Sequence, residues 1–152
     1  MQLETFDDVL HFAIRREHDA RELYLMFQTL VKDVGAKALL GDLAAYELGH
    51  QKLLEDVLKR GKVGRIGGKK KIADLRLNDY MVADKIGPDS SPQDIMVFAI
   101  KKEQEAHDIY HVLLGNYAGT ELEALFSQLA TEELKHKEIL EREYGQHFMQ
   151  WM

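Results

Sequence analysis

The sequence predicts an all-α protein, a four-helix bundle made of two repeated helical hairpins joined by a long crossover connection. Three observations predict this fold. Apolar residues recur at helical steps of three and four, only two prolines occur in 152 residues, and one half of the chain resembles the other at an offset of 86 residues. Two hairpins with one long connection are typical of a bundle with a single crossover.

The repeat is visible in two blocks of sequence. Residues 13–24 read AIRREHDARELY and residues 99–110 read AIKKEQEAHDIY, while LAAYELGH at 43–50 matches LATEELKH at 129–136. Aligning 5–57 with 91–143 without a gap gives 16 identities. We therefore expect a single domain over 1–152, with one hairpin at about 5–60, a connector at about 61–90 and a second hairpin at about 91–145.

The first helix of each hairpin has a recognisable start. Thr5 with Asp8, and Ser91 with Asp94, have the spacing of a capping box, and Pro92 stands at the first helical position of the second unit. In the first unit the helical period continues through Phe6, Leu10, Ala13, Ala20, Tyr24, Phe27 and Val31.

The turns and the second helices follow in the same order. KDVG at 32–35 and NYAG at 116–119 are predicted turns, and Thr120 with Glu123 predicts a capping box that opens the last helix. Each second helix then carries one stripe of residues, which is Leu39, Leu43, Glu47, His50 and Leu54 in the first unit and Leu125, Leu129, Glu133, His136 and Leu140 in the second.

The connector begins with a Gly/Lys-rich segment, GKVGRIGGKKK at 61–71. We interpret this segment as a solvated loop in preference to a phosphate- or partner-binding segment. Residues 72–86 have a locally helical pattern and could cross the bundle.

Composition excludes several classes of function. A net charge of −6 argues against a general nucleic-acid binder, and the lack of cysteine excludes disulfides, thiolate metal sites and Fe–S clusters. The first residues, MQLETFDD, lack the basic start and apolar run of a signal peptide, and no apolar stretch approaches the roughly 18 residues of a membrane span. We expect a cytoplasmic protein that binds neither nucleic acid nor membrane.

Six polar residues interrupt the apolar stripes. Glu17 and Glu103 each lie between alanines on the inner face of a first helix, and each second helix carries a Glu-x-x-His pair. Residues three apart share one helix face, so each pair can offer a carboxylate and an imidazole to one ion. The candidate metal ligands and catalytic residues are Glu17, Glu47, His50, Glu103, Glu133 and His136.

Hairpin geometry puts these residues at one level. Glu17 and Glu47 lie 15 residues on either side of residue 32, and Glu103 and Glu133 lie 15 residues on either side of residue 118. Fifteen helical residues span about 22 Å, so all four helices deliver ligands to one layer. Four buried carboxylates would cost several kcal/mol apiece without compensation, whereas two divalent cations balance their charge. Oxygen and imidazole ligands suit iron or manganese, and zinc is also compatible.

Taken one at a time, these residues also have interpretations that involve no metal. A lone Glu-x-x-His is a weak pattern, and a single histidine can be a hydrogen-bonded core residue; two pairs in register, each with an upstream buried glutamate, form a strong constellation. Tyr24 and Tyr110 are either hydrogen-bond donors to the ligands or ordinary core aromatics. The remaining histidines are interpreted as surface or local residues, namely His11, His18, His107, His111 and His147.

These motifs resemble the ferritin-like superfamily and, within it, the rubrerythrin group. The resemblance covers nearly the whole chain through AIRRE, ELGH, AIKKE and ELKH. It implies a centre of two iron ions that reduces hydrogen peroxide with electrons from an attached or separate rubredoxin, and it carries the six residues over as ligands. Two departures stand out: no cysteine-ligated rubredoxin domain is present, and Ala106 occupies a position where rubrerythrins usually have a further glutamate.

We therefore expect a di-iron oxidoreductase, a homodimer that acts on hydrogen peroxide or dioxygen with an external electron-donor protein such as a rubredoxin. A ferroxidase or an iron storage or delivery protein is the alternative. An oxygenase acting on an organic substrate is a third hypothesis, and a purely structural bundle is the weakest.

Overall fold

The computed structural model describes residues 5–60 and 90–152. Within these residues the chain forms four long helices, α1 (Phe6–Leu30), α2 (Val34–Arg60), α3 (Pro92–Asn116) and α4 (Glu123–Gln146), followed by a short helix α5 (Phe148–Trp151). The all-α prediction is confirmed for this part of the chain. The predicted loop at 61–71 and the predicted helical stretch at 72–86 lie outside the described residues.

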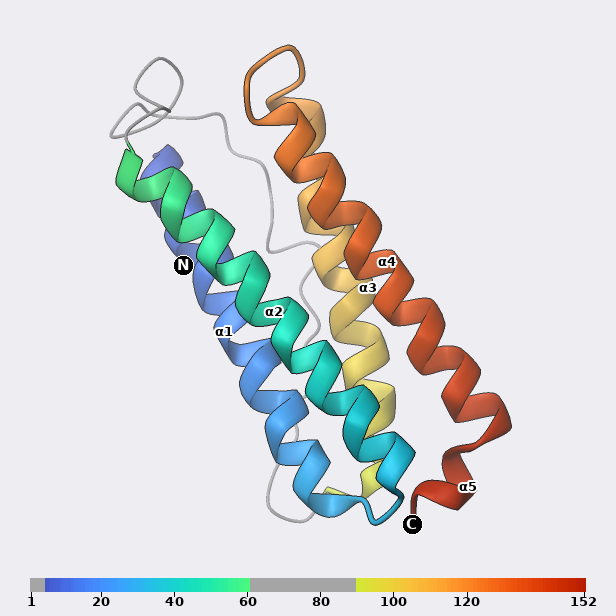
Figure 1. Ribbon diagram of the computed structural model, residues 1–152. Helices are drawn as coiled ribbons and strands as arrows, with labels where there is room; N and C mark the ends of the chain where they lie inside the picture. Colours follow the sequence, from blue (N-terminus) through green and yellow to red (C-terminus); the bar gives the residue numbers. More distant parts are fainter. Residues whose placement is uncertain (1–4, 61–89) are drawn as a thin grey trace.

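The helices form two antiparallel pairs that lie side by side (Figure 1). α1 packs on α2, α3 packs on α4, and the pairs meet through α1 and α3. α2 ends at one end of the bundle and α3 begins at the other, so these two helices run in the same direction. This arrangement is the ferritin-like four-helix bundle that the repeat predicts, with the long connection between the second and third helices.

Both capping boxes predicted for the first helices are confirmed. The backbone N–H of Asp8 donates to the Thr5 hydroxyl at 3.1 Å, and the Thr5 N–H donates to the Asp8 carboxylate at 3.0 Å. Ser91 and Asp94 exchange the same two hydrogen bonds, with Pro92 at the first turn of α3. These caps satisfy backbone donors that a helix N-terminus would otherwise leave unpaired.

The turns differ in detail from the prediction. The first turn is shorter than the predicted 32–35, because α2 already begins at Val34 and the Asp33 carboxylate accepts a 2.9 Å hydrogen bond from the Ala36 N–H. The capping box predicted from Thr120 and Glu123 is wrong. α4 begins at Glu123 without a side-chain cap, because the Thr120 hydroxyl is engaged within the turn, where it donates to the Tyr117 carbonyl at 2.5 Å.

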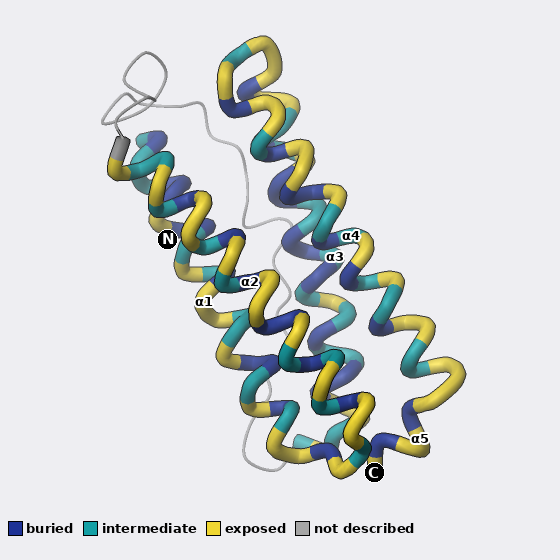
Figure 2. The backbone as a smooth tube through the Cα atoms, viewed as in Figure 1, coloured by how far each residue is buried: buried dark blue, intermediate teal, exposed yellow. Residues whose placement is uncertain are grey.

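Buried apolar residues form two clusters, one in each half of the bundle. Figure 2 shows buried positions, in dark blue, recurring along all four long helices. One cluster contains Phe6, Leu10, Leu54, Leu113 and Phe126. The other contains Phe27, Leu40, Ile95, Leu140 and Trp151. The polar layer predicted from the repeat lies on the same helices between these two clusters, so each half of the bundle has its own apolar core.

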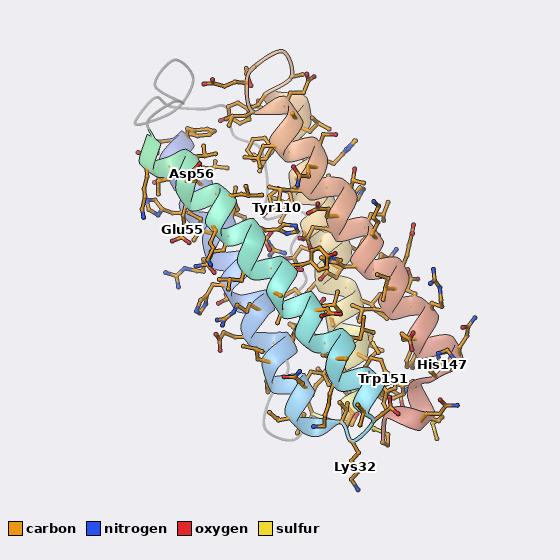
Figure 3. All side chains as sticks on the ribbon, in the orientation of Figure 1. Lys32, Glu55, Asp56, Tyr110, His147 and Trp151 are labelled. Carbon is orange, nitrogen blue, oxygen red and sulfur yellow. The ribbon has the colours of Figure 1, made fainter. Side chains whose placement is uncertain are left out.

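The second hairpin ends in an element that the sequence did not predict. α5 brings Trp151 to the turn between α1 and α2, and Figure 3 labels both Trp151 and Lys32 at this end of the bundle. The carbonyl of Trp151 accepts a 2.8 Å hydrogen bond from the Lys32 N–H, and its ring centroid lies 5.8 Å from that of Phe27. The end of the second hairpin is thus joined to the closed end of the first.

Candidate metal centre

All six predicted residues are buried and converge in the interior. Their exposed fractions run from 0% for Glu47 to 4% for His136. We call this set the carboxylate–histidine centre; it consists of Glu17 in α1, Glu47 and His50 in α2, Glu103 in α3, and Glu133 and His136 in α4.

The centre divides into two overlapping groups of possible ligands. In each group, one ligand atom per residue lies within 4.8 Å of the others. The first group is Glu17, Glu47, His50 and Glu133, and the second is Glu47, Glu103, Glu133 and His136. Glu47 and Glu133 belong to both groups. Two ions in these positions would share two carboxylates, and each would have its own glutamate and its own histidine.

Both imidazoles direct Nδ1 toward the carboxylates. His50 Nδ1 lies 2.8 Å from Glu133 Oε1 and 3.5 Å from Glu17 Oε2. His136 Nδ1 lies 3.1 Å from Glu47 Oε1 and 3.8 Å from Glu103 Oε2. The two rings are nearly parallel, with an interplanar angle of 15° and 6.0 Å between centroids. Each histidine therefore faces carboxylates from both hairpins.

Several polar atoms in the centre are buried without a hydrogen-bond partner. They are Oε2 of Glu17, Glu47 and Glu103, Oε1 of Glu133, and Nδ1 of His50; the last two atoms lie 2.8 Å apart without forming a hydrogen bond to each other. Such atoms carry the full cost of desolvation unless something coordinates them. All of them are oxygen or imidazole nitrogen donors, a set that suits iron, manganese or zinc. The residues present therefore fit a pair of divalent metal ions.

The pKa values show how unfavourable the centre is without cations. Burial, followed by repulsion from Glu17 and Glu103, raises the pKa of Glu47 well above its ordinary value. Burial, with repulsion from Glu17 and Glu47, raises the pKa of Glu133 to about 8. Buried carboxyl groups that cannot all ionise together hold protons, and metal ions would displace those protons.

The two histidines differ in their electrostatic surroundings. Burial alone would lower the pKa of His50, but the carboxylates of Glu133, Glu17 and Glu47 around it raise this pKa above its ordinary value. Burial and the neighbouring His50 lower the pKa of His136 to about 4. One imidazole thus carries the positive charge of the metal-free centre and the other stays neutral.

Two tyrosines donate hydrogen bonds to glutamates of the centre, each across the interface between the hairpins. Tyr110, which projects from α3 in Figure 3, donates a 2.6 Å hydrogen bond to Glu17 Oε1. Tyr24 in α1 donates to Glu103 Oε1. Burial raises the pKa of both phenols, so both stay protonated and act as donors. Of the two readings of these residues, hydrogen bonding to the candidate ligands is the one observed, although both rings also belong to the apolar clusters.

Glu132 is a functional candidate that the sequence analysis missed. Its carboxylate contacts Nε2 of His50, on the side of the ring away from the centre. Because a carboxylate accepts the Nε2–H, Nδ1 is left free for a metal ion. The residue related to Glu132 by the repeat is Tyr46, whose ring lies 5.2 Å from that of His136. The only signal for Glu132 in the sequence was its position directly before Glu133, a candidate ligand.

A second missed feature lies between α1 and α3. Glu105 is buried, and its carboxylate forms an ion pair with Arg16 of α1 and a 3.3 Å contact with Lys102. The repeat gave no signal for this residue, because the position related to Glu105 is Asp19, whose side chain is 70% exposed. This ion pair joins the two hairpins beside the centre.

Three of the other histidines have hydrogen-bond partners, two within their own helix or its end and one across α3 and α4. His18 lies near Asp19, and His147 near Glu143. His107 bonds the Ala130 carbonyl at 2.8 Å, and its ring stacks on that of His111.

Among the described helices, none is both long and apolar enough to cross a lipid bilayer.

Comparison with known proteins adds one finding. Residues 94–151, which comprise most of α3, all of α4 and α5, match the family model of rubrerythrin. No curated protein and no solved structure matches the chain. The match covers the second hairpin, and the first hairpin repeats its ligand pattern at the offset of 86 residues. Over residues 94–151, the chain is therefore similar to the rubrerythrin family.

Proposed function

We propose that the protein is a peroxidase that binds two iron ions and reduces hydrogen peroxide with electrons from an external donor protein. The observation that carries this proposal is the sharing of Glu47 and Glu133 between the two ligand groups. Shared carboxylates keep two ions close together, and two adjacent one-electron donors suit the two-electron reduction of an O–O bond. The overall step consumes one peroxide, two electrons and two protons and forms two waters.

The residues would divide the work as follows. Glu47 and Glu133 would be ligands for both ions, Glu17 and His50 would complete one position, and Glu103 and His136 would complete the other. When bound, the iron pair supplies the electrons. Tyr110 and Tyr24 orient the terminal carboxylates, and their hydrogen bonds leave the second oxygen of each glutamate free to coordinate. The apolar clusters on both sides keep bulk water out of the centre.

A cavity of about 220 Å³ supports peroxide access. Its lining includes all four glutamates of the centre and also Asp19, whose side chain is exposed. A small oxidant therefore has a way from the surface of α1 to the carboxylates.

Stopped-flow spectroscopy tests the proposal. The protein is loaded with two Fe(II) per chain without oxygen and mixed with hydrogen peroxide, and we expect oxidation much faster than that of free Fe(II) under the same conditions. Glu141→Gln, at an exposed position of α4, is the matched control for Glu133→Gln on the same helix. Consumption of peroxide no faster than by free Fe(II) would exclude the peroxidase.

Iron oxidation with storage or delivery is the second candidate, because the same oxygen-rich ligand set also suits Fe(II) as a substrate. Gel filtration combined with iron titration separates the two functions. Saturation at two irons per chain in a small oligomer, which we expect to be a homodimer, supports the peroxidase. Uptake of many irons per chain in a closed shell supports storage.

A further inference from the structure

The cavity beside the carboxylate–histidine centre is larger than hydrogen peroxide requires. Its volume is about 220 Å³. A water molecule occupies about 30 Å³ of liquid, so hydrogen peroxide, with two oxygen atoms, needs roughly 60 Å³. An apolar cavity of about 150 Å³ in another protein is large enough to bind benzene. Because the four glutamates of the centre line the cavity, two bound ions would fill part of this volume, and the remainder has room for an organic group.

Apart from the glutamates, part of the cavity wall is apolar. Ala20 and Leu23 of α1 line one side, and Phe98 and Ala106 of α3 line the other. These side chains offer no hydrogen bonds. They would contact an alkyl or aryl group favourably and would leave extra water poorly bonded.

The two alanines create the space. Ala20 follows Glu17 by three residues and Ala106 follows Glu103 by three, so the repeat places a methyl group directly beside each terminal glutamate. A longer side chain at either position would extend over the centre. The structure thus leaves room on both helices at the same level.

An ion pair fixes the spacing of the two helices at this point. Arg16 of α1 and Lys102 of α3 both line the cavity, and both contact the buried carboxylate of Glu105. A charged pair that is buried and connects two helices resists their approach, because closing the gap would displace its partners. The cavity is therefore held open by the fold.

We infer that the protein accepts organic hydroperoxides, with the O–O group at the carboxylate–histidine centre and the organic group between Ala20, Phe98 and Ala106. This inference rests on the proposed function and names its substrate class. The O–O bond breaks, the oxygen attached to carbon leaves as an alcohol, and the terminal oxygen leaves as water. The external donor protein supplies the two electrons, and solvent supplies the two protons.

Parallel measurements with two oxidants test this inference. The Fe(II)-loaded protein is mixed separately with hydrogen peroxide and with cumene hydroperoxide, and both rates are compared with those of free Fe(II). Faster reaction with both is the expected result. Faster reaction with hydrogen peroxide alone would overturn the inference while the peroxidase stands, and acceleration of neither would overturn both.

Substitution of the alanines then tests the position of the organic group. Ala106→Leu should lower the ratio of the cumene hydroperoxide rate to the hydrogen peroxide rate about tenfold or more, because a filled pocket rejects the larger substrate. Ala20→Leu, at a less buried position, should lower the same ratio and serves if Ala106→Leu does not fold. Ala124→Leu, at an exposed position of α4, is the control and should leave the ratio unchanged. An unchanged ratio in both cavity variants would contradict the proposed position.

Binding can also be measured without turnover. The zinc-loaded protein is redox-inert, and saturation-transfer NMR with cumyl alcohol, the product of the reaction, reports contact with the protein. We expect a signal for the parent and for Ala124→Leu and its loss in Ala106→Leu or Ala20→Leu. Equal signals in all of these proteins would mean that the alcohol binds elsewhere, and the inference would be wrong.

Discussion

The phenol of Tyr110 in α3 donates a 2.6 Å hydrogen bond to Oε1 of Glu17 in α1, and the repeat-related Tyr24 in α1 donates in the opposite direction to Glu103 in α3. Each hairpin thus holds the terminal carboxylate of the other. Because both hydrogen bonds run between α1 and α3, the geometry of the centre depends on how these two helices pack together.

Replacing Tyr110 by phenylalanine should weaken metal binding. A hydrogen bond to a charged group contributes about 1.5–3 kcal/mol, so we expect the dissociation constant of the more affected ion to rise about tenfold or more. Equilibrium titration with Co(II), followed by its visible absorption, measures the change. Tyr144→Phe is the control, because its phenol accepts a hydrogen bond from Gln93 at an exposed position. Equal affinities for the parent and Tyr110→Phe would show that the bond does not orient Glu17.

Glu132 should matter for metal binding through its contact with His50. Burial would raise the pKa of Glu132, but the neighbouring imidazole of His50 lowers it, so the carboxylate is ionised at neutral pH. Residues that orient a ligand histidine typically change metal affinity about 10–100-fold when removed. We expect Glu132→Gln to lose affinity in this range for one of the two ions in a Co(II) titration.

The control for Glu132→Gln is Glu141→Gln on the same helix. Glu141 is half exposed and lies 3.6 Å from Lys137. A loss of affinity that is equal for both ions, or equal in the two variants, would contradict a specific role for Glu132 behind His50.

The stability of the metal-free protein should fall as pH rises from about 6.5 to about 8. Glu133 has a pKa of about 8 in the fold against an ordinary value of 4.5, and the pKa of His50 is raised from 6.5. Between pH 6.5 and 8 the folded state therefore binds more protons than the unfolded state, and stability decreases with pH. His136, whose pKa is lowered to about 4, acts in the opposite direction below pH 6.5 and not in this window.

Urea denaturation at several pH values, with and without Zn(II), measures this dependence. Metal ions replace the protons of the centre, so the zinc-loaded protein should become more stable, not less, as pH rises through the same window. A metal-free protein whose stability is constant between pH 6.5 and 8 would show that Glu133 does not hold a proton in the fold.

The repeat explains why so much of the fold was predictable. Glu17 and Glu103, with the two Glu-x-x-His pairs, stand at equal distances from the turns, and helix geometry alone brings them to one level. The capping boxes at Thr5 and Ser91 are local patterns, so they too were readable from the sequence. Both kinds of prediction depend on spacing along one helix or one hairpin.

The features that escaped prediction depend on contacts between hairpins. Glu105 and Asp19 are equivalent in the repeat, yet Glu105 is buried against Arg16 and Asp19 is exposed, because only one of them faces a basic partner across α1 and α3. The Trp151 carbonyl bonds Lys32, more than a hundred residues away in the chain. The Thr120 hydroxyl bonds backbone in its own turn, in competition with the predicted cap. None of these choices is encoded in a periodicity.

Glu47 gives the sharpest test of whether the centre exists to bind metal. Without metal, Glu47 is a buried carboxyl group beside three others, and Glu47→Gln removes a potential charge from this cluster. At pH 8 the metal-free variant should therefore be more stable than the parent, with a melting temperature a few degrees higher, since about 1 kcal/mol corresponds to roughly 2–4 °C in a chain of this size.

With Zn(II) present the order should reverse. The parent gains stability from bound metal, about 2.7 kcal/mol when free metal is 100 times the dissociation constant, whereas the variant lacks a carboxylate shared by both ligand groups. Calorimetric scans of both proteins with and without Zn(II) give the comparison, with Glu55→Gln as a control elsewhere on α2. If the variant is less stable than the parent without metal and gains as much stability from Zn(II), Glu47 is a structural residue. A metal ligand is expected to destabilise the metal-free protein and to stabilise the metal-bound one.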